Sequence, residues 1–140
     1  MDRSEDEILA AELAALGAAS GGSGRLTRLV ANLMRKNVHE IGLVVPLPFE
    51  DAVRHVADVL GRAGRAVGPV HVEPGMDQLT IRVVTGGGVG GLNPVVVTAV
   101  VTHDGDGGAK VGLRAAAKEG LIKQRAGEKT AVLLAASLSI

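Results

Sequence analysis

The chain has 140 residues, with 15 Lys or Arg, 15 Asp or Glu, no cysteine and a single aromatic residue, Phe49. A length of 140 suits one domain, and zero net charge argues against a general binder of nucleic acid or anionic membranes. The absence of cysteine excludes disulfides, thiol nucleophiles and Cys-ligated metals, and a single aromatic residue excludes aromatic cages and base-stacking platforms.

Residues 1–36 are predicted to form a helical arm. Its first helix is expected over residues 4–16, because Ser4 and Glu7 form a capping-box pattern that precedes leucines at helical spacing. Residues 17–24 consist of Gly, Ala and Ser, a composition typical of a flexible linker.

The second part of the arm, residues 25–36, is predicted to be a basic helix. It has no acid, and its apolar residues form one stripe. Residues 1–16 hold five acids, so pairing between the two helices, within one chain or between subunits, is the favoured interpretation. The alternative is contact with an anionic partner through the four cations of this helix, which are Arg25, Arg28, Arg35 and Lys36.

Residues 37–140 are predicted to form one α+β domain that begins with a strand and a helix. Val38–Val45 is rich in β-branched residues and is followed by prolines, which cannot donate to a strand ladder. A helix is predicted next, from Pro48 in its first turn to Gly64 at its end, because its apolar residues share one face. Phe49 lies on that face and is expected to be the largest contributor to the core.

Four more strands and a final helix complete the predicted domain. Turns rich in Gly, Pro and Asp separate the strands, and Pro69 favours an edge position for the first of the four. The last segment, from Lys118 to Ile140, is predicted to be helical with a start that its glycines leave open, and its apolar end from Ala131 onward is expected to be buried. The four strands are predicted at Arg65–Glu73, Gln78–Thr85, Val95–Thr102 and Ala109–Ala117.

The expected order of the domain is β-α-β-β-β-β-α. Together with the arm, it predicts an α+β fold in which a five-stranded curved antiparallel sheet carries helices on one face and is preceded by two N-terminal helices. Over residues 38–140 this order resembles that of a TATA-binding-protein repeat or of a shortened helix-grip domain. The likeness is one of topology, without a functional motif of either family, and it implies no shared function.

One strand predicts that the sheet has a second covered face. Alternate residues of Val95–Thr102 can face the helices, but Val96 and Val100 then point the other way. A strand that is apolar on both faces is usually covered on both, and the candidate covers are the N-terminal helices and a second copy of the protein. The expected interaction surface consists of Val84, Val96, Val100, Arg82 and Arg114.

Two glycine-rich stretches have the spacing of ligand-binding loops. Gly86–Gly91 satisfies the dinucleotide pattern G-x-G-x-x-G, but Pro94 and three valines predict a strand where that pattern needs the start of a helix. We interpret this stretch as a mobile hairpin loop that could also contact a partner. His103–Gly107 places oxygens at alternate positions but lacks the later acidic ligand of a calcium loop, so we interpret it as a hairpin turn.

No motif argues for catalysis. The four histidines lack the spacing and clustering of a metal site, and His55 is predicted to lie on the solvated, ion-paired face of its helix. The serines lack the flanking residues of known nucleophile motifs. We therefore predict no catalytic, cofactor-binding or metal-binding residue.

These features predict a non-enzymatic binding or assembly module that is homo-oligomeric or binds another protein. The alternative is a carrier of a small apolar ligand, held in a cavity between the sheet and the C-terminal helix, and zero net charge disfavours a nucleic-acid partner. The sequence shows no signal-peptide pattern and no apolar run near the roughly 20 residues of a membrane span, so a cytoplasmic location is expected.

Overall fold

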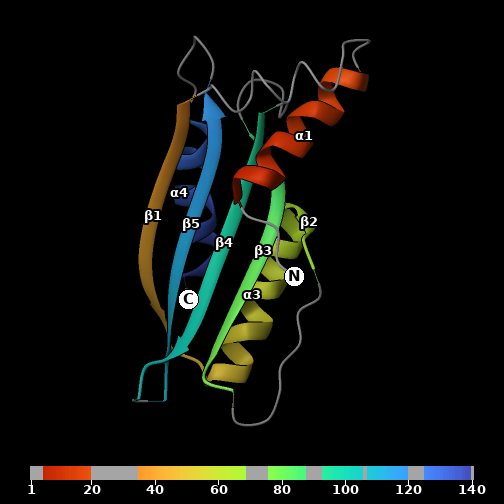
Figure 1. Ribbon diagram of the computed structural model, residues 1–140. Coiled ribbons are helices and arrows are strands. Elements are labelled where there is room, and N and C mark those ends of the chain that lie inside the picture. Colours follow the sequence, from red (N-terminus) through yellow and green to blue (C-terminus); the bar gives the residue numbers. More distant parts are fainter. Residues whose placement is uncertain are drawn as a thin grey trace.

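The computed structural model describes residues 5–19, 35–68, 76–87, 93–105, 107–119 and 125–139. After an initial helix, the strands and helices follow one another in the predicted order (Figure 1). In chain order they are α1 (Glu5–Ala19), β1 (Arg35–Val45), α3 (Phe49–Ala63), β2 (Arg65–Ala66), β3 (Gln78–Gly87), β4 (Asn93–His103), β5 (Ala109–Glu119) and α4 (Ala126–Leu138).

The five strands form one open antiparallel sheet in the order β1-β5-β4-β3-β2. β3, β4 and β5 form a meander, and β1 pairs with the last strand, β5. α3 and α4 lie behind the sheet and α1 lies in front of it (Figure 1). The predicted α+β class, the antiparallel sheet and the β-α-β-β-β-β-α order are confirmed.

The main core lies between the sheet and the two helices behind it. Every second residue of β3, β4 and β5 points into this core, as strand geometry requires. α3 contributes its buried face from Phe49 to Leu60, and α4 contributes Ala131, Leu134 and Leu138. α4 approaches the sheet closely at Gly127, where a side chain would place its first carbon 2.7 Å from the main-chain oxygen of Asn37.

Several elements extend beyond their predicted limits because the antiparallel ladder continues where a partner strand is available. β1 begins at Arg35, so Arg35 and Lys36 lie in a strand and not in a basic helix. β5 continues through Lys118, and α4 begins only at Ala126. β3 extends through Gly87, so the first glycines of the predicted loop belong to a strand and pair with the start of β4.

The described part of the arm also differs from prediction. α1 passes Gly17 and ends at Ala19, since a single glycine costs only about 1 kcal/mol inside a helix. β2 has two residues and is an edge strand of the sheet, next to β3. Three other predicted features lie outside the described residues: the rest of the linker, residues 25–34 of the basic helix, and the strand around Pro69.

Two expectations about the helices behind the sheet were wrong. The end of α4 is not buried all round, because only one side of the helix faces the sheet and Val132 and Leu133 are 53% and 69% exposed. His55 is only half-exposed, and its Nε2 lies 3.0 Å from the main-chain oxygen of Leu138, which links α3 to the end of α4. The predicted ion pairs on the solvated face of α3 are present, between Arg54 and Asp51 and between Arg62 and Asp58.

Replacing Phe49 by alanine should destabilise the fold strongly. The side chain is 3% exposed in the main core, and truncating a buried phenylalanine typically costs about 3–5 kcal/mol. A urea titration of the free energy of unfolding measures the effect. Val132→Ala is the control, because Val132 is 53% exposed and surface changes usually stay within about 0.5 kcal/mol. A loss below about 1 kcal/mol for Phe49→Ala would contradict its place in the core.

Candidate functional site

The front face of the sheet, away from α3 and α4, is built from cross-strand rows of side chains. Residues directly opposite each other on neighbouring strands lie side by side on one face, and the observed register includes three consecutive rows that build the site. The first is apolar, the second polar and the third small. From α1 outward they are the apolar row (Val84, Val96, Ala116, Val38), the polar row (Arg82, Thr98, Arg114, Glu40) and the small row (Thr80, Val100, Gly112, Gly42).

α1 covers three of the four residues of the apolar row. Ile8 and Leu9 of α1 are 2% and 0% exposed, and they form a second core cluster with Val84, Val96 and Ala116. The helix crosses the front of the sheet near the end where β4 begins (Figure 1). α1 is therefore the cover of Val96 in this structure, whereas Val100, two rows further along, stays partly exposed.

Ion pairs fix α1 on the sheet at its start and near its middle. Near its start, Glu5 accepts hydrogen bonds from Arg114 of β5 at 3.0 and 3.2 Å, and Lys36 of β1 lies 2.5 Å from Glu5 and 2.9 Å from Asp6. Further along the helix, Glu12 pairs with Arg65 of β2. The acids of α1 therefore face cations from both edges of the sheet.

The cations keep the first acids of α1 ionised. Burial would raise the pKa of Glu5, but hydrogen bonds from Arg114 and Lys36 together outweigh it and hold that pKa below its ordinary 4.5. The hydrogen bond from Lys36 likewise lowers the pKa of Asp6 from its ordinary 3.8. The pKa of Lys36 is raised, because its bonds to the two acids exceed the effect of burial.

An open hollow of about 400 Å³ lies beside the covered half of the face. Gly42 and Gly112 are paired across β1 and β5, and a side chain at either position would meet no atom within 4 Å of its first carbon. Val100 and the polar row border this glycine floor. At the end towards α1, Arg114 lies 2.5 Å from Glu40 and also binds Glu5, so one guanidinium joins the hollow to the helix.

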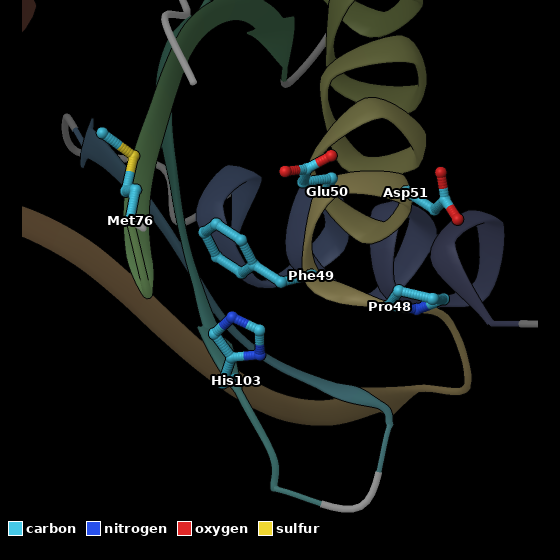
Figure 2. A pocket seen from close by; sticks show the side chains of 6 residues that line it. All are labelled: Pro48, Phe49, Glu50, Asp51, Met76 and His103. Atoms are coloured by element: carbon cyan, nitrogen blue, oxygen red, sulfur yellow. The ribbon is translucent and has the colours of Figure 1, made fainter. Parts of the chain in front are cut away.

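A second hollow, of about 350 Å³, lies at the start of α3. Figure 2 shows the ring of His103 beneath that of Phe49, with Asp51 pointing away from both, and the two rings stack at 4.7 Å. Glu50 and Asp51 are first-turn acids, which helices favour without any ligand. No group of three metal-ligating side chains occurs among the described residues.

The predicted interaction residues share the front face. Val84 and Val96 lie beneath α1, and Val100 and Arg114 border the hollow. Arg82 donates a hydrogen bond to Thr98 at 3.0 Å, in the polar row between these two regions. Of the four predicted contacts for an anionic partner, Lys36 is engaged by the acids of α1 and Arg35 lies in β1. Arg25 and Arg28 are outside the described ranges.

Sequence reasoning missed the glycine floor. Gly42 and Gly112 each sit inside a predicted strand, and a glycine there often marks a close approach by other groups. That signal was present, but their meeting on neighbouring strands follows only from the pairing of β1 with β5.

No protein-family model matches the chain, and no curated protein matches it significantly. Within the described ranges, no helix is long and apolar enough to cross a membrane. The function proposed for the protein therefore rests on the geometry of the front face.

Acid should loosen α1 from the sheet. Because the pKa values of Glu5 and Asp6 are lowered in the fold, their ion pairs stabilise the docked helix fully above about pH 4.5, and this stabilisation is lost as the pH falls through the lowered values. Amide hydrogen exchange at Leu9, compared with Val97 of the main core, measures the loosening. The double variant Glu5→Gln, Asp6→Asn should speed exchange at Leu9 already at neutral pH, and an unchanged pH dependence in it would contradict this assignment.

Proposed function

We propose that the protein is a non-enzymatic assembly module that binds a second copy of itself through the front face of the sheet. α1 stands on one half of this face and the hollow occupies the other half, so the face is stepped. A two-fold rotation sets the helix of each copy against the hollow of the other, and a stepped face is then complementary to itself. This stepped shape is the observation that carries the proposal.

The composition of α1 supports a partner on its outer side. The seven residues after Glu12 are Leu, Ala or Gly, without a polar side chain. An apolar stretch of a helix is normally buried. In the proposed dimer the outer side of α1 would lie in the hollow of the second copy, which would bury this stretch.

The floor of the hollow suits a helix with small side chains. Glycines without side chains let another backbone approach closely, and Gly42 and Gly112 present such a surface beside Val100. Val38 and Val44 of β1 are 36% and 58% exposed on the same face. Burying this edge together with the hollow would remove Val38, Val44 and Val100 from water.

The alternative of a carrier for an apolar ligand has less support. Neither of the two hollows lies between the sheet and α4, and the residues of α4 that face the sheet are packed into the main core. The proposal includes a cytoplasmic location, because a chain without cysteine needs no oxidising compartment.

A lysine in the hollow should abolish self-association without harming the fold. Gly112→Lys places its first carbon in open space, and glycine inside a strand is itself unfavourable, so the variant should remain folded. Sedimentation equilibrium should show a dimer for the original protein and a monomer for Gly112→Lys.

Gly61→Lys is the matched control, because Gly61 lies on α3 behind the sheet and is equally open. This variant should remain dimeric. A monomeric original protein, or a dimer that survives Gly112→Lys, would overturn the proposed interface.

A further inference from the structure

The surface beneath α1 is an apolar patch surrounded by cations, which we call the cradle. Its floor is formed by Val84, Val96 and Ala116, each at most 8% exposed under the helix. Its rim carries Lys36, Arg65, Arg114 and Lys118, contributed by three strands.

Each rim cation faces an acid of α1. Lys36 and Arg114 bind Glu5, Arg65 binds Glu12, and Lys118 approaches Asp6 at 4.0 Å with a side chain only 9% exposed. The cradle therefore matches a helix that combines acids at its start with an apolar inner side. α1 has that pattern: three of its first-turn residues are acidic, and Ile8 and Leu9 face the sheet.

α1 is separable from the rest of the fold. The main core and the cluster under α1 have no residue in common among those described, so removing the helix leaves the packing behind the sheet intact. Fifteen residues, 20–34, connect α1 to β1, and 15 residues can span up to about 50 Å. Neighbouring packed helices are about 10 Å apart, so this connection is long enough for α1 to reach the cradle of a copy packed against its own.

We propose that the cradle is a docking site for the α1 of a second copy, so that two chains exchange this helix reciprocally. The inference rests on the self-association proposed above, in which both α1 helices lie in one layer between two facing sheets. An exchanged helix makes the same ion pairs and apolar contacts as a helix on its own sheet, so the exchange changes only the course of the connecting residues.

Charge reversal in full-length chains tests the exchange. One variant carries Glu5→Lys and Asp6→Lys, and the other carries Lys36→Glu and Arg114→Glu. In each variant alone, α1 and the cradle repel each other. In an exchanged pair of the two variants, a basic helix sits on an acidic cradle and an acidic helix on a basic one. Native mass spectrometry of the equimolar mixture should show the heterodimer as the predominant species.

A disulfide then locates the helix. Leu9 and Val96 are both fully buried in the cluster under α1, and the chain contains no other cysteine. When a chain with Leu9→Cys is unfolded and refolded with a chain carrying Val96→Cys, oxidation should give a covalent dimer. A chain with both substitutions should oxidise efficiently, which shows that the geometry permits the bond, and the pair Leu9→Cys with Val44→Cys should not crosslink.

The outcomes separate the two proposals. A dimeric original protein that gives neither the charge-reversed heterodimer nor the crosslink overturns the exchange and leaves the proposed self-association standing. A monomeric original protein overturns the self-association, and the exchange in the original protein with it, even where the charge-reversed variants form a crosslinkable heterodimer. A monomer that gives neither product overturns both.

Discussion

The pairing of β1 with β5 is the constraint on which the front face of the sheet depends. These strands are far apart in the chain, yet they pair over eleven residues. Their register sets Glu40 beside Arg114 and Gly42 beside Gly112, which creates both the polar row and the glycine floor. A shift of one residue would turn every side chain of β1 to the opposite face, so the hollow and the anchor of α1 would be lost together.

Local patterns in the sequence were sufficient for most elements but not for their pairing. The helix after Pro48 and the two-sided apolar strand around Val96 were predicted from periodicity, and the second of these indicated that the front face is covered. Lys36 could not be placed, because its local sequence is helical in character and only the ladder with β5 draws it into a strand. The glycine floor was hidden for the same reason: each glycine is ordinary alone, and the site exists only where the two strands meet.

Different interactions determine how strongly α1 is attached to the sheet and in which direction it lies. Burying Ile8 and Leu9 supplies most of the free energy, at about 1.5–3 kcal/mol for each fully buried side chain. The ion pairs are partly exposed, and such pairs contribute about 0–1 kcal/mol each. They do fix direction, because Glu5 binds towards β1 and β5 while Glu12, about 10 Å further along the helix, binds Arg65 at the opposite edge. Reversing α1 would separate these charges from their partners.

The proposed self-association through the stepped front face would stop at two copies. The protein has a second exposed apolar feature, Val132 and Leu133 of α4, on the far side of the sheet. If the hollow of one copy received α4 of another, each addition would leave a free hollow and a free α4, and the chain of copies would grow without limit. A two-fold contact between stepped faces uses the same surface on both partners and leaves no hollow open. The two residues on α4 then remain as a small apolar patch of a size that folded proteins commonly expose.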